Sequence, residues 1–286
     1  MSTAYLLIAH GSRDPRPQAA MNRLAQLVRE KLSQEQSHRP VMASNALRPL
    51  NRSPLNASAW GASASPFTTP SVTTTLPRPE PSVLSPAAIV GTAVLECGPL
   101  SLKQQICEFG NRVKAAGIQQ LKLVPIFLMA GVHVVDDIPA EVSAAQQQLG
   151  SELKLSLCDH LGSQPGLKQL LQDRLALLPR QGQLLVAHGS RKRHGNRAVE
   201  AVAKRLGTAI AYWSIPPDIE SQVVMLMQQG AQTVTILPYF LFPGGITDAV
   251  AHRTEELAER FPKVKFRLLP PLGASSRLAD IIVDFI

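Results

Sequence analysis

The sequence contains few cysteines and no long apolar segment. Its three cysteines, Cys97, Cys107 and Cys158, are scattered and form no CxxC motif, a pattern typical of a reducing compartment. No uninterrupted apolar run reaches the roughly eighteen residues of a membrane span. Residues 1–5 lack the basic region of a signal peptide. We therefore expect a soluble, cytoplasmic protein with no membrane partner.

A recognised nucleic-acid-binding motif is also missing, although the chain of 286 residues carries a formal net charge of +8. Part of the basic excess lies between residues 34 and 86, in a segment with an unusual composition. A small polyanionic ligand fits the positive charge as well as a nucleic acid does. We expect no nucleic-acid partner, and such a partner would require tight, salt-sensitive binding.

Residues 34–86 are rich in Pro, Ser, Thr, Asn and Ala and show no apolar periodicity. A segment of this kind cannot bury enough apolar surface to offset the entropy lost on ordering. The composition therefore predicts a disordered insertion. A plain flexible insert is the simpler interpretation, and a regulatory docking segment is the alternative.

The chain repeats itself. Residues 5–13 read YLLIAHGSR and residues 183–191 read QLLVAHGSR, each an apolar run followed by His-Gly-Ser-Arg. The repeat predicts two related lobes: residues 1–33 and 87–180 form the first, and residues 181–286 form the second. In both, short Val/Ile/Leu runs alternate with amphipathic patterns, which predicts βαβ units on parallel sheets.

The expected elements follow the same order in the two lobes. In the first lobe we expect strands at 4–9, 88–95, 121–128 and 153–158 and helices at 17–32, 101–116, 136–149 and 166–178. In the second we expect strands at 183–187, 209–214, 232–240 and 263–269 and helices at 195–206, 217–229, 246–260 and 275–285. The predicted fold class is α/β, with a mostly parallel sheet flanked by helices in each lobe.

Two further matches align the lobes beyond the first motif. LVPIFLMAGVH at 123–133 matches ILPYFLFPGGI at 236–246, so His133 falls opposite Ile246. ECGP at 96–99 matches WSIP at 213–216, so Glu96 falls opposite Trp213. Only the first lobe then combines a motif histidine with a second histidine and a carboxylate.

The predicted strands of the first lobe end at three groups that bind metals. His10, Glu96 and His133 each follow or end a strand, and ligands of open α/β sheets bind at the carboxyl ends of strands. Two imidazoles and a carboxylate suit a divalent metal such as Fe²⁺, Co²⁺, Ni²⁺ or Zn²⁺. The second lobe keeps only His188. The sequence therefore predicts one working site, with the second lobe as a degenerate copy that forms a wall of the cleft.

Structural roles compete with each of these assignments. His188 equally fits a hydrogen-bonded structural histidine, and a backbone anion nest with no catalytic role is an alternative for the His-Gly-Ser-Arg turn. Glu96 also fits a cap of the next helix. Asp137, ahead of Pro139, is interpreted first as a helix N-cap and second as an outer partner of a ligating histidine. The remaining histidines are expected at the surface: His38, His160, His194 and His252.

Three stretches of the sequence together resemble a known family. AHGSR at 9–13, the strand end at Leu95-Glu96, and the stretch 125–139 with its Gly-x-His-x-x-x-Asp-Ile-Pro pattern resemble sirohydrochlorin chelatases of the CbiX/SirB type. The likeness covers nearly the whole chain outside the insertion. It implies a class II chelatase fold of two Rossmann-like lobes with a tetrapyrrole cleft between them, the first lobe active and the second degenerate.

The resemblance also implies an activity, insertion of Fe²⁺ or Co²⁺ into sirohydrochlorin in siroheme or cobalamin biosynthesis. The family's metal positions carry over to His10, Glu96 and His133, and His10 and His133 are the expected catalytic groups. A neutral imidazole near the metal can accept a pyrrole proton. Because sirohydrochlorin is a polycarboxylate, we expect Arg13 and Arg191 to bind its carboxylates, helped by the backbone of Gly11 and Ser12. An intramolecular ion pair is the alternative for each Arg.

Other functions stay open on the sequence alone. A non-catalytic carrier of metal or tetrapyrrole would use the same ligands, and a metal-dependent hydrolase would use them on bound water. We expect no cofactor beyond the substrate metal, and iron and cobalt are not distinguished because their affinities are adjacent in the divalent series. A monomer is expected, with a dimer as the alternative, since the duplication already supplies both walls of a cleft.

Overall fold

A computed structural model of the chain describes residues 3–38, 88–192 and 194–286. The predicted insertion at 34–86 lies outside the described residues except at its start. There the prediction was wrong, because residues 34–38 continue the first helix. Among the described residues, we find no helix with the length and apolar character needed to cross a membrane.

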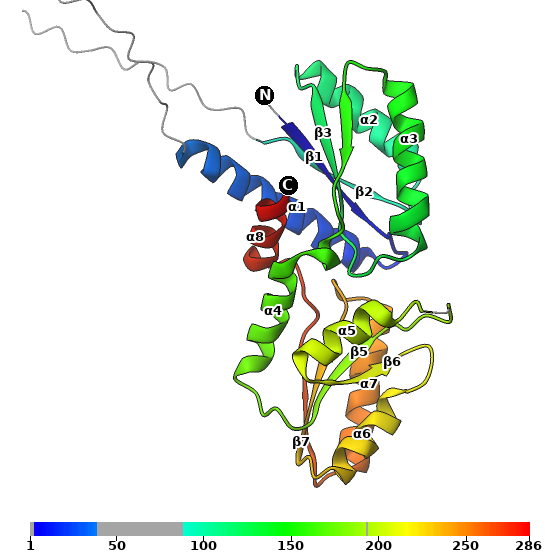
Figure 1. Ribbon diagram of the computed structural model, residues 1–286, viewed down its shortest axis with the longest axis vertical. Helices are drawn as coiled ribbons and strands as arrows, with labels where there is room; N and C mark the ends of the chain where they lie inside the picture. Colours follow the sequence, from blue (N-terminus) through cyan, green and yellow to red (C-terminus); the bar gives the residue numbers. More distant parts are fainter. Residues whose placement is uncertain (1–2, 39–87, 193) are drawn as a thin grey trace, which may run out of the picture.

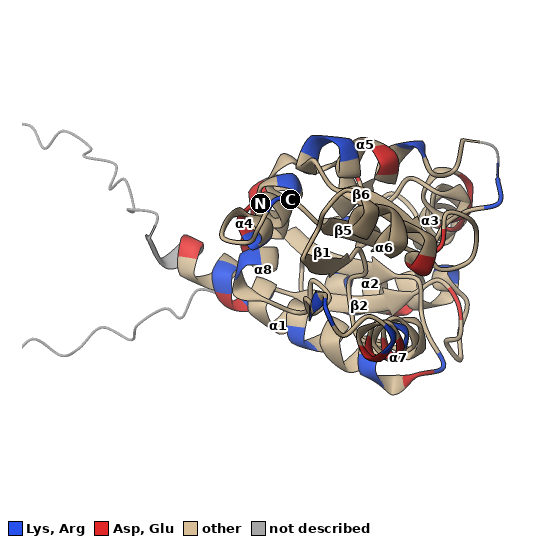
Figure 2. Ribbon diagram, turned by 90° about the horizontal axis from the view of Figure 1, so that it is seen from below, with Lys and Arg blue, Asp and Glu red and all other residues tan. Residues whose placement is uncertain are grey.

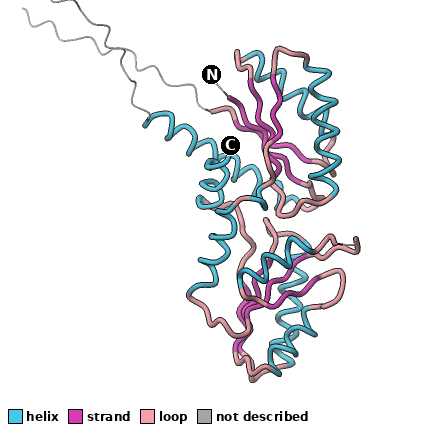
Figure 3. The backbone as a smooth tube through the Cα atoms, in the orientation of Figure 1, coloured by secondary structure: helices cyan, strands magenta, loops and turns pink. Residues whose placement is uncertain are grey.

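The first lobe is a parallel sheet covered by helices (Figure 1, Figure 3). Its strands lie in the order β2-β1-β3-β4, with bounds β1 (Thr3–Ala9), β2 (Val90–Val94), β3 (Gln120–Pro125) and β4 (Lys154–Leu157). The helical segments from this half of the chain are α1 (Pro15–His38), α2 (Leu102–Ala115), η1 (His133–Asp137), α3 (Ile138–Leu149), η2 (Leu161–Ser163) and α4 (Pro165–Ala176).

The second lobe repeats this sheet. Its strands lie in the equivalent order β6-β5-β7-β8, all parallel, with bounds β5 (Gln183–Ala187), β6 (Ala209–Tyr212), β7 (Thr233–Pro238) and β8 (Lys265–Leu268). The helices are α5 (Arg197–Leu206), α6 (Ile219–Gln228), α7 (Gly245–Arg260) and α8 (Ser276–Phe285). The predicted pair of α/β lobes is confirmed.

Burial explains why the central strands form. Leu6, Leu7 and Ile8 in β1 are at most 1% exposed, and every residue of β5 is buried. A strand that is apolar on both sides needs helices on both faces of its sheet, which the alternating helices supply. The next helix, α2, begins with a capping box between Ser101 and Gln104, so Glu96 is not its cap.

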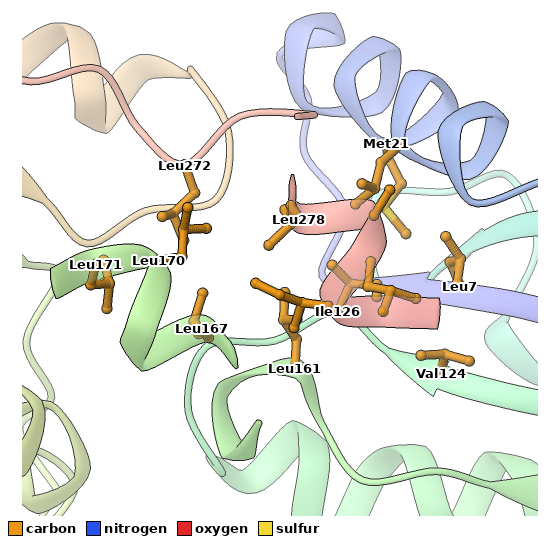
Figure 4. Packing of buried hydrophobic residues seen from close by; sticks show 14 of the residues in the cluster. Leu7, Met21, Val124, Ile126, Leu161, Leu167, Leu170, Leu171, Leu272 and Leu278 are labelled. Atoms are coloured by element: carbon orange, nitrogen blue, oxygen red, sulfur yellow. The ribbon is translucent and has the colours of Figure 1, made fainter. Parts of the chain in front are cut away.

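The last helix of each half packs outside its own lobe. In Figures 1 and 4, α8 of the second half lies against α1 of the first lobe. The helix α4 of the first half contacts α5 of the second lobe. Leu278 of α8 is fully buried in the cluster that also contains Met21 of α1 and Leu167 of α4. The two lobes therefore exchange helices and share one apolar core.

Polar contacts follow the same exchange. Asp280 of α8 forms an ion pair with Lys31 of α1, and Arg277 of α8 forms one with Asp173 of α4. Gln183 of β5 donates its side-chain N–H to the carbonyl of Leu175 at 3.4 Å, which ties α4 to the second sheet. The exchange leaves the carboxyl ends of both sheets facing a common space between the lobes.

Candidate metal centre and interlobe cleft

The end of β1 places His10 and brings Glu96 beside it. The backbone N–H of Leu95 donates to the Ala9 carbonyl at 2.9 Å, and that of Glu96 donates to the His10 carbonyl at 2.8 Å. The pairing of β1 with β2 thus continues beyond both strands. Gly11 has a φ of +98°, and a Cβ at this position would lie 1.9 Å from the Glu96 carbonyl oxygen. A glycine is therefore required for this close approach.

The segment after β3 places His133 through a single π-helical turn, η1. The Nδ1 atom of His133 lies 2.7 Å from Oδ2 of Asp137, one turn further along the chain. Such a carboxylate contact fixes the ring, and with the proton on Nδ1 the Nε2 lone pair is free to bind a metal. Turns of this kind are frequent at functional sites.

The first interpretation of Asp137, as an N-cap, was wrong. The backbone of Asp137 is already helical, with φ −68° and ψ −51°, and its side chain makes no capping hydrogen bond. A capping residue needs a non-helical backbone that turns its side chain back onto the first N–H groups. Because η1 runs directly into α3, Asp137 contacts His133 instead, as the second interpretation expected.

His10, Glu96 and His133 converge. Their ligand atoms all lie within 4.8 Å of one another, and the rings of His10 and His133 meet edge to face with centroids 4.8 Å apart. Ligand atoms about 2.1 Å from one ion lie at most about 4.2 Å apart, so small side-chain rotations close the cluster onto a metal. His10 and Glu96 are exposed, which gives an ion access from solvent. It is the one such group among the described residues.

The second lobe carries a different set at the equivalent positions. His188 follows β5 and is exposed. The backbone N–H of Ser214, rather than that of Trp213, donates to the His188 carbonyl, at 2.9 Å. Ser214 is therefore the counterpart of Glu96, and the alignment of Glu96 with Trp213 was wrong by one residue. The Ser214 hydroxyl also donates to the His188 carbonyl at 2.8 Å. Ile246 takes the place of His133.

A cavity of about 990 Å³ separates the two lobes at the carboxyl ends of their sheets. His10 and His133 line it from the first lobe, and His188 lines it from the second. Aromatic and aliphatic side chains form much of the remaining wall, among them Phe127 and Phe240 at matching positions after β3 and β7. A cavity of this size and lining suits a large ligand with an apolar body and polar or charged groups at its edge.

The predicted substrate-binding residues take different positions. Gly11 and Ser12 line the cavity, whereas Arg13 and Arg191 are exposed and are not among its lining residues. Their contact with substrate stays a prediction. The sequence interpretation missed Lys192 and Arg197, which do line the cavity, and assigned His194 only to the surface. The extra basic residues that follow the second His-Gly-Ser-Arg motif could have indicated Lys192 and Arg197 as binding residues.

An ion-pair network at the edge of the cavity joins the two lobes. Arg16, at the start of α1, binds both Asp14 and Asp248 of α7. The guanidinium of Arg16 holds the pKa of each carboxyl below its ordinary value, chiefly through the side-chain hydrogen bonds.

His160, expected at the surface, is half-buried, and this burial lowers its pKa. His252 is exposed on α7, as expected.

Comparison with known proteins assigns the family. The family model described as CbiX matches this chain twice, over residues 83–177 and 182–286. The protein belongs to the CbiX family, in a form with two fused lobes, and the predicted class II chelatase fold is confirmed.

One curated relative and two solved structures extend this result. Sirohydrochlorin ferrochelatase, chloroplastic, from Arabidopsis thaliana is 31% identical over 113 residues, covering 36% of this chain and 50% of the relative, so the match spans about half of that relative's length. SirB from Bacillus subtilis with Fe³⁺ has a TM-score of 0.63 at 14% identity, covering 100% of this chain and 94% of SirB.

The second structure is CbiX, described as the terminal enzyme for biosynthesis of siroheme in denitrifying bacteria. It has a TM-score of 0.50 at 19% identity, and the match covers 98% of this chain and 96% of the CbiX chain. At these identities the two structures establish the shared fold alone.

Proposed function

We propose that this protein inserts Fe²⁺ or Co²⁺ into sirohydrochlorin, supplying metallated tetrapyrrole for siroheme or cobalamin biosynthesis. The observation that carries the proposal is the convergence of His10, Glu96 and His133 at the edge of a cavity of about 990 Å³ between the lobes. Family membership and the name of the plant relative support the same substrate and reaction.

The arrangement provides the parts that metal insertion needs. The divalent ion enters from solvent and binds His10, Glu96 and His133 while the macrocycle lies between apolar walls such as Phe127 and Phe240. The ion exchanges its protein ligands for the four ring nitrogens, and the loss of two pyrrole N–H protons balances its 2+ charge. An imidazole released from the metal accepts one proton, and Glu96, exposed at the edge of the cluster, passes protons to solvent.

The duplicated lobe has a separate role in this proposal. Ser214 and Ile246 replace the carboxylate and second imidazole, and one histidine alone binds a divalent ion weakly. His188 therefore belongs to the wall of the cleft, and the second lobe holds the macrocycle against the metal site.

Anaerobic absorption spectroscopy of sirohydrochlorin with Fe²⁺ or Co²⁺ tests the proposal. Protein-dependent conversion with many turnovers is expected, and His10→Ala or His133→Ala should reduce the rate by at least about a hundredfold. His188→Ala should retain most of the activity. His252→Ala, an exposed histidine outside the cavity, is the matched control.

The outcomes separate the candidate functions. Tetrapyrrole or metal binding without conversion would replace the chelatase by a carrier. Equal losses from His133→Ala and His188→Ala would contradict the single-site arrangement.

A further inference from the structure

The two walls of the cavity differ in charge. The first lobe presents His10 and His133, whereas the second presents Lys192 and Arg197 beside His188 and His194. Lys192 and Arg197 are exposed, and neither forms an ion pair with any acidic residue in the part of the chain that the structure describes. The second wall thus offers two unpaired cations to whatever occupies the cavity.

The first lobe has no such cations at its equivalent positions. Lys192 aligns with Asp14 through the repeated His-Gly-Ser-Arg motif, and Asp14 neutralises Arg16, which also binds Asp248. Arg197 aligns with Ala19 in the same register. The positive wall is therefore specific to the second lobe and is not a remnant of the shared fold.

Local hydrogen bonds link the backbone of Lys192 and the side chain of Asn196, the neighbour of Arg197, to Ser190. The backbone N–H of Ser190 donates to Oδ1 of Asn196 at 2.8 Å, and Nδ2 of Asn196 donates back to the Ser190 carbonyl at 3.0 Å. The N–H of Lys192 donates to the Ser190 hydroxyl at 3.2 Å. Figure 2 shows basic residues along α5. Lys192, through its own N–H, and Arg197, through its neighbour Asn196, are thus both linked to Ser190.

We propose that Lys192 and Arg197 are the carboxylate-binding residues of the cavity and hold the edge of a polycarboxylate tetrapyrrole. The inference rests on the proposed function, and it moves this role away from Arg13 and Arg191. An Arg guanidinium binds a carboxylate through two parallel hydrogen bonds, and Lys adds a compact charge. Anchoring at the second lobe leaves the pyrrole nitrogens facing His10 and His133. Unpaired cations beside an apolar cavity also increase the encounter rate with a polyanion.

Metal-free uroporphyrin, a fluorescent polycarboxylate tetrapyrrole, tests the site without requiring turnover. Its dissociation constant should increase by roughly a hundredfold in Lys192→Gln/Arg197→Gln, since each charged hydrogen bond lost weakens binding by about tenfold. Lys204→Gln/Arg205→Gln is the matched control, because it removes the same charge from the exposed end of α5 outside the cavity. Circular dichroism checks that both variants fold.

Kinetics with sirohydrochlorin then separate this inference from the proposed function. In the cavity variant the KM for sirohydrochlorin should rise while the Kd for Co²⁺ stays unchanged. Equal uroporphyrin affinity in the two double variants overturns the inference even if metal insertion occurs. A wild-type protein that binds uroporphyrin through Lys192 and Arg197 but inserts no metal would overturn the proposed function and leave the inference standing.

Discussion

The contact between His133 and Asp137 shows what the sequence allows at the scale of single residues. Asp ahead of Ile-Pro fits a helix cap, and the same spacing fits a carboxylate one turn from a histidine. The π-helical turn decides between them because it gives Asp137 a helical backbone. Such a turn has no sequence signal of its own. The convergence of His10, Glu96 and His133 could be predicted, since strand ends of a parallel sheet meet at one edge.

Asp137→Ala should weaken binding of Co²⁺ by about 10- to 100-fold, because His133 loses the partner that fixes its ring. The Kd for Co²⁺, measured from the absorption of the bound ion, checks this without turnover. Asp136→Ala removes the same charge from the neighbouring exposed residue and is the matched control. Asp137→Asn keeps an acceptor oxygen and should restore part of the affinity. Equal weakening in the two alanine variants would indicate a general effect of charge.

At the scale of elements, the strands and helices follow closely from apolar patterning. The strand predicted at 183–187 has the observed bounds, because its residues are all buried. The prediction shortened the first helix, since the polar residues after Leu32 showed no periodicity although the helix continues to His38. Which lobe each helix covers could not be predicted. An amphipathic helix such as α8 shows which of its faces is buried but carries no signal for the surface that buries it.

The helix exchange gives a prediction for α8. Leu278 is fully buried beside α1, so Leu278→Ala should lower the free energy of unfolding by about 2–5 kcal/mol, as measured by urea denaturation. Amide hydrogen exchange should become faster first in α1 and β1 of the first lobe, although the substitution lies in the second half of the chain. Leu226→Ala in α6 is the matched control and should accelerate exchange within the second lobe. If amide hydrogen exchange became faster only within the second lobe in both variants, the packing of α8 on the first lobe would be contradicted.

At the scale of the whole molecule, few polar ties join the lobes around the cavity. The Tyr239 hydroxyl, at the end of β7, donates to the carbonyl of Leu128 in the first lobe at 3.2 Å, and Arg16 binds Asp248. The repeat predicts that two lobes exist and that a cleft separates them. The hydrogen bond and the ion pair each join two residues far apart in the sequence. No sequence pattern links the partners, so these contacts could not be predicted.

The pKa of each of the three tyrosines is raised above its ordinary value. Burial is the main cause in each: it raises the pKa of Tyr5, and it raises the pKa values of Tyr212 and Tyr239 to about 12 from an ordinary 10.0. For Tyr212, the nearby Glu200 carboxylate adds to the increase. Because the unfolded chain loses these protons more readily, the stabilisation is complete below pH 10 and is lost as the pH rises toward about 12.

Phenolate absorbance followed with circular dichroism should therefore show ionisation together with unfolding above pH 10, whereas urea-unfolded protein should titrate near its ordinary value of 10.0. Tyr239→Phe removes one of the groups and should make the alkaline loss of stability shallower. Tyrosine ionisation near pH 10 in a protein that keeps its native spectrum would contradict the prediction.

The exchange of α4 and α8 joins two lobes with different cavity walls in one chain, which determines how the lobes pair. Two separate chains that carried the same differences would combine at random, and like pairs would bring two histidine faces or two cationic faces together. One covalent chain sets a high effective concentration for the unlike partner. Every molecule then holds one face of each kind, in fixed stoichiometry and at any dilution.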